Sequence, residues 1–479
     1  MGPKEETRRR GRHPRPARSP RKEPAMKHPA HRPAALLSAA LLALLCACAP
    51  AGTAAPTPTP TPTPASAPDA AASAGPSAGA PLEQPVSTGF ENLTQVSGSS
   101  YGSGSGEGFY ELIARQDGSA NLRYIDYASA REIYLCAAPN CTHDNESCPS
   151  WLADPACTPL VVGDRLLLFY PSPSTTAGRP MQILKAGLDG SDRQTLIEFD
   201  ASESCRSLVS ANDHLLVMLV TRTDDTGADV EQGLVSVNLD TGERSSFYTV
   251  PEGMSPQFLG VTESGYCILY TVQETLSDED FPDTEWSENR DKILSSRVHH
   301  WTAVPLGGSR GREIFQAAGD LQCMVADDGI YVFNVNTQEL RRVTVPDGRE
   351  ETVAALPPQE NWQPYSAVFD RKVGDWLLFS VSYYTDEINE ETGNPNATDL
   401  SYAVNTVTGE QRQLQIQYDY YGSSRACTVL ARTDTDLFLL TSNHGGDQMH
   451  YGFQYGIIPI QDYLDSNAAA LRQVTVLTG

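Results

Sequence analysis

The side chains best suited to chemistry lie together in one stretch of thirteen residues. Cys136, Cys141 and Cys148 stand there with His143 between them, and Cys157 follows soon after. Cysteine sulfur and histidine nitrogen are ligands that zinc prefers, and cysteines in an exported protein also form disulfides. The sequence concentrates such groups nowhere else, so this stretch is the first candidate for a functional site.

Three interpretations of the stretch stay open. A structural zinc ion would take Cys136, Cys141, His143 and Cys148 as a closed set of four ligands. Alternatively, two of the four cysteines, counting Cys157, form one disulfide, or all four form two, and spacing alone does not give the pairing. Catalysis would need an open coordination position or a base beside a thiolate, and the sequence supplies no partner for either. In each case we expect the stretch to fasten a long loop.

Charge restricts the class of partner. The chain of 479 residues has a formal net charge of −25, although its first 47 residues are basic. A surface this acidic repels phosphate backbones, which argues against nucleic acid as a partner. It suits an extracytoplasmic protein that meets neutral glycans, cations or other proteins.

The N-terminus reads as an export signal, which we assign to residues 1–48. Translation starts either at Met1, which gives a long basic leader, or at Met26, which we favour. The apolar run Ala34–Ala47 has the length of a signal-peptide core and is too short to span a bilayer. Its end, Leu45-Cys46-Ala47-Cys48, resembles the bacterial lipoprotein signal, with Cys48 as the lipidated residue; an ordinary secretory signal is the alternative. We therefore expect export and a lipid anchor on the outer face of the cell membrane.

A Pro-, Thr-, Ala-, Ser- and Gly-rich linker follows at residues 49–107. Proline fixes φ and removes a backbone donor, so such a segment is disordered and extended and carries no core. The folded domain is expected at residues 108–479.

That domain must position the cysteines, and it reads as a repeating β unit. Seven short apolar runs recur at intervals of 46 to 64 residues, each opened by a polar turn. Their starts are Gly108, Asp164, Asp213, Gly265, Gly329, Asp375 and Asp436. This pattern predicts an all-β fold, a β-propeller of six or seven four-stranded blades, with residues 472–477 closing the ring against the first blade. Paired β-sandwiches are the alternative.

Two segments carry a family resemblance. The Leu188-Asp189-Gly190 turn with Arg193 on the next strand resembles a blade of the YWTD propellers of lipoprotein receptors. The Cys-x4-Cys-x-His-x4-Cys segment after Tyr124-Ile-Asp-Tyr127 is similar to one in uncharacterised bacterial lipoproteins with such propellers. The resemblance implies the propeller fold. The YWTD signature itself is missing, so receptor function is not implied.

These features predict a membrane-anchored, extracytoplasmic propeller that binds an envelope component, a glycan or a protein. The alternative is an extracytoplasmic hydrolase or lyase that degrades a glycan or peptide. No local catalytic motif supports the enzyme, yet a propeller can gather an acid and a base from separate blades. Enzymatic activity therefore stays open, and a purely structural scaffold is a third class.

Overall fold

The structure is a computed structural model that describes residues 81–92, 102–277, 280–281, 286–388, 395–420, 423–445 and 451–477. All of them belong to the compact unit Ala67–Gly479. The expected signal peptide, Met26, the lipidation candidate Cys48 and most of the linker lie outside the described residues. None of the helices in the described part combines the length and apolar character needed to cross a bilayer.

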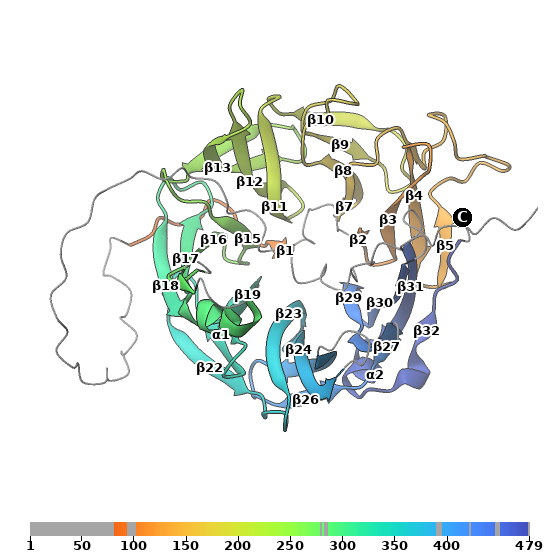
Figure 1. The fold of residues 1–479 in the computed structure, drawn as a ribbon. Helices are drawn as coiled ribbons and strands as arrows, with labels where there is room; N and C mark the ends of the chain where they lie inside the picture. Colours follow the sequence, from red (N-terminus) through yellow and green to blue (C-terminus); the bar gives the residue numbers. More distant parts are fainter. Residues whose placement is uncertain are drawn as a thin grey trace, which may run out of the picture. The chain divides into compact units, whose positions relative to one another are not determined.

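The described strands form seven four-stranded antiparallel sheets, arranged as blades around a central axis (Figure 1). Within each blade the four strands follow one another along the chain from the innermost to the outermost. The prediction of an all-β propeller is confirmed, with seven blades, and the alternative of paired sandwiches is wrong.

The blades are numbered in chain order. Blade 1 has β2 (Ser103–Gly104), β3 (Gly108–Ala114), β4 (Ala120–Asp126) and β5 (Arg131–Tyr134), with β6 (Trp151–Leu152) added beside β4. Blade 2 has β7 (Thr158–Val162), β8 (Arg165–Tyr170), β9 (Gln182–Ala186) and β10 (Gln194–Glu198). Blade 3 has β11 (Glu203–Ala211), β12 (Leu215–Thr223), β13 (Asp229–Asn238) and β14 (Arg244–Thr249). Blade 4 has β15 (Gln257–Val261), β16 (Tyr266–Gln273), β17 (Val298–Pro305) and β18 (Arg312–Ala318).

The remaining blades follow the same order. Blade 5 has β19 (Leu321–Ala326), β20 (Gly329–Asn334), β21 (Glu339–Val343) and β22 (Glu350–Ala355). Blade 6 has β23 (Gln363–Val373), β24 (Trp376–Ile388), β25 (Pro395–Asn405) and β26 (Gln411–Leu414). Blade 7 has β29 (Thr428–Arg432), β30 (Asp436–Gly445), β31 (Tyr451–Pro459) and β32 (Arg472–Gln473). A hairpin, β27 (Gln417–Tyr420) and β28 (Ser423–Ala426), stands between blades 6 and 7.

Burial explains why the second strand of each blade is the one visible in the sequence. The seven apolar runs are β3, β8, β12, β16, β20, β24 and β30, the second strand of every blade. Each is flanked within its sheet and packs against neighbouring blades on both faces, so β8 is buried at all positions but its first. A strand buried on both faces reads as a continuous apolar run, whereas the outermost strand β10 has no buried residue.

The meander gives the ring two different ends. At one end, which we call the turn face, lie the connections from first to second and from third to fourth strands. At the other end, the loop face, lie the connections from second to third strands and the links between blades. The loop face carries the segment between β5 and β6, the helix α1 (Trp286–Ser296) and the β27–β28 hairpin. The short helices α2 (Ile460–Leu464) and η3 (Ala468–Ala470) lie between β31 and β32.

The two ends of the propeller meet at blade 1. Thr475 accepts a hydrogen bond from the backbone of Glu132 and donates one to Ala130, both at 2.9 Å. Arg131 and Thr475 form a parallel bridge, so the C-terminal tail lies along β5. The prediction that residues 472–477 close the ring against the first blade is confirmed.

Residues before Gly108 also join the propeller. The segment 81–92 crosses the turn face of blade 4, where Val86 donates to the Leu306 oxygen at 3.0 Å and Gly89 to that of Glu263 at 2.8 Å. It ends in β1 (Glu91–Asn92), which pairs with β11 on the inside of blade 3. The folded part thus begins N-terminal to the start expected from the sequence.

Candidate metal centre

The four expected metal ligands converge in the loop between β5 and β6. The sulfur atoms of Cys136, Cys141 and Cys148 and a ring nitrogen of His143 all lie within 4.8 Å of one another. We call these four residues the cysteine cluster. Cys148 is buried, and the other three are half-buried. The structure thus brings together the set that the sequence spacing allowed.

His143 is fixed from three sides. Its backbone has a φ of 54°, a left-handed conformation that is uncommon outside glycine. Its carbonyl oxygen accepts hydrogen bonds from Asn121 at 2.8 Å and Arg115 at 3.2 Å. Its ring stacks on Tyr134, with centroids 4.1 Å apart, and places Nδ1 3.3 Å from the Sγ atom of Cys148. These contacts aim the imidazole at the cluster.

The exit of the loop is fastened to blade 1. The backbone N–H of Cys148 donates to Asn145, and its carbonyl accepts from Trp151, both at 3.0 Å. Ser150 Oγ donates to the Leu122 oxygen at 2.8 Å. Trp151 then opens β6, which pairs with β4. Cys148 therefore stands on a turn whose backbone groups are paired.

A neighbouring blade holds the same loop. Arg193, after the β9–β10 turn of blade 2, donates to the carbonyl of Trp151 at 2.8 Å and to that of Pro149. Gly190 in that turn has a φ of 77°, and a Cβ there would lie 2.8 Å from the Pro149 oxygen. The two segments that carry the family resemblance in the sequence are thus in contact with each other.

Local groups shift the acidities of the cluster. The backbone N–H of His143 donates to Cys141 Sγ at 3.4 Å and, with the neighbouring thiols, lowers the pKa of Cys141 below its ordinary value. Burial raises the pKa of Cys148 to about 11. Burial and the Arg115 charge lower the pKa of His143, which favours the neutral ring that can bind a metal.

Cys157, the fifth residue of the predicted site, lies apart from the cluster. It is buried in the core between blades 1 and 2, with Leu152 and Tyr170 among its cluster of apolar neighbours. Burial raises the pKa of its thiol to about 12, so it is an inert thiol near neutral pH. It is not among the four converging ligands.

The cluster is a closed set. Its ligand atoms face one another, and no residue of the cluster lines the two pockets described below. A metal held by all four would have no open position for substrate, so the arrangement fits a structural centre better than a catalytic one.

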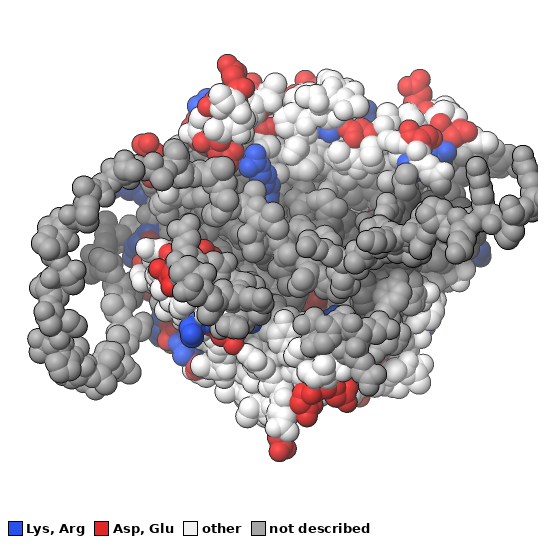
Figure 2. All heavy atoms as spheres, viewed as in Figure 1, with Lys and Arg blue, Asp and Glu red and all other residues white. Residues whose placement is uncertain are grey.

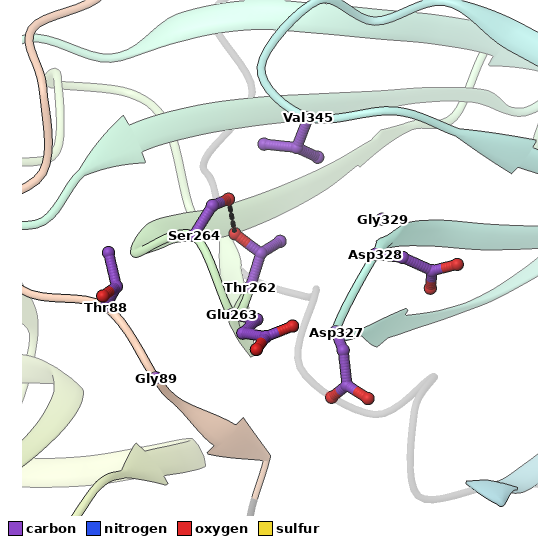
Figure 3. A pocket seen from close by; sticks show the side chains of 9 residues that line it. All are labelled: Thr88, Gly89, Thr262, Glu263, Ser264, Asp327, Asp328, Gly329 and Val345. Carbon is purple, nitrogen blue, oxygen red and sulfur yellow. Dashed lines mark hydrogen bonds between the residues drawn. The ribbon is translucent and has the colours of Figure 1, made fainter. Parts of the chain in front are cut away.

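Those two pockets lie on the turn face and were not predicted from the sequence. The first, of about 430 Å³, is lined by the β15–β16 and β19–β20 turns and by Thr88 and Gly89 (Figure 3). Figure 3 shows Glu263 and Asp327 extending to the same side of it. Asp328 is paired with Arg342 at 3.0 Å and Lys372 at 3.2 Å. In the sequence these residues read only as polar turns.

The second pocket, of about 750 Å³, lies among blades 1, 2, 6 and 7. It is lined by basic residues such as Arg371 and Arg432 and by acidic ones such as Glu91 and Asp434. Arg371 donates to the Leu430 oxygen at 2.8 Å, which ties blade 6 to blade 7. Charges of both signs are therefore present, and the lining does not select one kind of ligand.

No protein-family model and no curated protein matches the sequence. Among solved structures, the chain is similar to a prolyl endopeptidase, with a TM-score of 0.46 and 11% identity, over 81% of this chain and 49% of that one. It is similar to the β-propeller domain of the trilobed protease from Pyrococcus furiosus, with a TM-score of 0.44 and 8% identity, over 78% and 93% of the chains. An oligogalacturonate lyase from Vibrio parahaemolyticus gives a TM-score of 0.42 and 11% identity, over 75% and 95%. The chain spans about half the length of the prolyl endopeptidase, and its blade count rests on its own strand pairing.

Proposed function

We propose that this chain is an exported lipoprotein whose propeller binds a glycan or protein partner in the cell envelope. The lipoprotein-type sequence at Leu45–Cys48 and the Pro-rich linker after it support the anchor. The resemblance to uncharacterised bacterial lipoproteins with receptor-like propellers fits this proposal.

The observation that carries a binding role is a set of exposed apolar side chains on the loop face. Val230 at the start of β13, Met254 in the link to blade 4 and Val272 near the end of β16 are 54%, 43% and 40% exposed. All three stand at the same end of two adjacent blades. Exposed apolar side chains at one end of the ring offer apolar area for a partner to cover.

Acidic groups lie near Val230, two of them paired with Arg206 and Arg222. The β12–β13 connection carries Asp224 and Asp225, and Asp229 opens β13 beside Val230. Figure 2 shows acidic side chains gathered at the outer edges of the ring, including the edge near β12 and β13. A partner with an apolar centre and a basic or neutral rim would complement such a surface.

Binding is tested with the full chain, extracted in mild detergent, against arrays of envelope glycans and peptides. We expect saturable binding without turnover, weakened about tenfold or more by Val230→Asp or Val272→Asp, since an introduced charge must be desolvated in the interface. Val407→Asp is the matched control, because Val407 is 73% exposed and lies on the turn face. Equal binding by all variants would remove the loop face from the proposal.

The same arrays distinguish the alternative function. A hydrolase or lyase would release products from a glycan or peptide, which mass spectrometry of the incubated arrays detects. Product formation that remains with the protein through purification would support the enzymatic function in place of the binding proposal.

The anchor has its own test. We expect the mature N-terminus at Cys48, with acyl chains detected by mass spectrometry, when translation starts at Met26. Cys48→Ser should abolish lipidation, and Cys46→Ser should preserve it. A mature chain without lipid in the wild type would leave an ordinary secretory signal and contradict the anchor.

A further inference from the structure

We propose that the cysteine cluster binds one structural zinc ion, with thiolates from Cys136, Cys141 and Cys148 and Nδ1 of His143 as ligands. This inference is independent of what the propeller binds, because it concerns how one loop of the ring is held.

The geometry fits a tetrahedral ion. Zinc bonds of about 2.3 Å to sulfur and about 2.0 Å to nitrogen separate tetrahedral ligand atoms by roughly 3.5 to 3.8 Å. In the structure all four ligand atoms lie within 4.8 Å of one another, and Nδ1 of His143 is 3.3 Å from Cys148 Sγ. Small side-chain rotations are enough to complete the site.

The composition of the cluster argues against disulfides. It holds three cysteines, so a disulfide between two of them would leave one thiol and one imidazole without a role. A second disulfide would need Cys157, which is buried in the core between blades 1 and 2 and is not among the converging ligands. Three sulfurs and one nitrogen are instead a complete ligand set for zinc, a borderline-soft ion.

The surroundings suit the charge of such a centre. Zinc with three thiolates and a neutral imidazole carries a net charge of −1. Arg115 and Arg193 are hydrogen-bonded to the backbone of the loop at His143 and at Trp151, and the N–H of His143 points to Cys141 Sγ. Cations and N–H donors around ligating thiolates stabilise their charge and hold them in place.

Zinc would join two blades through one loop. The loop leaves β5 of blade 1, returns to the same blade as β6 and leads on to β7 of blade 2, and Arg193 binds it from blade 2. Binding of all four ligands to one zinc ion would fix the backbone of the loop that Arg193 contacts. Holding a loop in this way is the role of a structural rather than a catalytic zinc.

The first experiment uses the exported full chain, purified in mild detergent without reductant or chelator. Elemental analysis should give one zinc per chain, and X-ray absorption should give three sulfur neighbours and one nitrogen. Intact mass after denaturing alkylation should show every cysteine of the cluster as a free thiol. A metal-free chain with a disulfide among these cysteines would overturn the proposal.

The second experiment compares ligand variants. Cys141→Ser and His143→Ala should each lose zinc at least tenfold in stoichiometry, whereas Cys323→Ser, a half-buried cysteine of blade 5 outside the cluster, should retain it. Zinc retained in full by both ligand variants would assign the ion to another site and sink the proposal.

A measurement on the wild type keeps the test valid if the variants fail to fold. Chelation should increase protease cleavage between residues 137 and 147, and added zinc should reverse it. Replacement by Co²⁺ should give the intense visible bands of tetrahedral cobalt with thiolate ligands. Cleavage and spectra that are unchanged by these treatments would contradict the site.

Discussion

The backbone N–H of Leu477 donates a hydrogen bond to Glu132 Oε2 at 2.5 Å, across 345 positions of the sequence. Glu132 also accepts from Arg123 at 2.8 Å, within blade 1. Val474 and Val476 of the same tail pack against the apolar core between blades 1 and 7. The C-terminal tail therefore contributes to closing the ring.

Removing this tail should destabilise the whole propeller. A chain that ends at Gln473 loses the backbone hydrogen bonds of Thr475 and the bond to Glu132, together with two partly buried valines. We expect a loss of about 3 kcal/mol in the free energy of unfolding, measured by urea denaturation. A chain that ends at Leu477 is the control and should match the wild type. Equal midpoints for the two truncations would show that the tail does not contribute to closure.

The same junction predicts a pH dependence. Glu111 is buried and hydrogen-bonded to Tyr455 and Glu132, and burial together with the Glu132 charge raises its pKa well above the ordinary value. The folded state thus holds a proton that the unfolded state releases above about pH 4.5. The contribution of Glu111 is present below that pH and is lost as pH rises toward its folded pKa.

Glu111→Gln should remove much of this dependence, because glutamine is neutral and keeps both a donor and an acceptor. As the pH rises from 5 to 8, the wild type should lose more stability than the variant in urea denaturation. Glu198→Gln on the exposed strand β10 is the control and should follow the wild type. Parallel stability curves for Glu111→Gln and the wild type would contradict a proton held on Glu111 in the folded state.

Arg193→Lys should loosen the link between blades 1 and 2. A lysine cannot reproduce the fork that serves the carbonyls of Pro149, Trp151 and Gly190. We expect a loss of about 1 to 3 kcal/mol in thermal or urea unfolding, because these oxygens lose their charged donor. Arg222→Lys, in the exposed pair with Glu231, should change stability by less than about 0.5 kcal/mol. Similar losses for both variants would contradict a special role of Arg193.

A comparison of Gly348→Ala with Gly253→Ala separates the cost of steric overlap from the cost of a positive φ. Gly348, in the β21–β22 turn of blade 5, has a φ of 71°, and a Cβ there would overlap the backbone oxygen of Ile314 in β18 of blade 4. Gly253 has a φ of 82° with no atom within 4 Å of its Cβ position. Gly253→Ala should cost about 1 kcal/mol for backbone strain, and Gly348→Ala about 3 kcal/mol, since strain and overlap add. Equal losses of stability in the two variants would show that the backbone at Ile314 moves aside without cost and that overlap adds nothing.

The sequence predicts the blades because each has one strand buried on both faces. These seven strands are nearly uninterrupted apolar runs, so the repeat is visible although its spacing varies. The outer strands give no comparable signal, as in the exposed Gln194–Glu198 or the two-residue β32. A β strand without a buried face shows no alternation of apolar and polar residues. For this reason the sequence did not distinguish a propeller of six blades from one of seven.

For the candidate site, the sequence reveals the ligands but not the residues that position them. The cysteine cluster is visible because its ligands lie within thirteen residues. Arg115, Asn121 and Tyr134, which position it, lie in or beside the strands of blade 1 and carry no signal of their own. Arg193 stands out in the sequence only as part of the family resemblance, which does not indicate that it contacts the cluster. The separation of Cys157 from the cluster is also a property of packing between blades. Spacing alone therefore could not rank a metal centre above disulfides.

The N-terminal segment gives the propeller a mechanical property. A pull on the chain before Pro81 meets the backbone bonds of Val86 and Gly89 on blade 4 first, and then the β1–β11 pairing in blade 3. Only beyond those contacts does the chain continue to β2 in blade 1. Tension applied to the chain before Pro81 is therefore borne by blades 4 and 3 before it reaches β2, the first strand of blade 1.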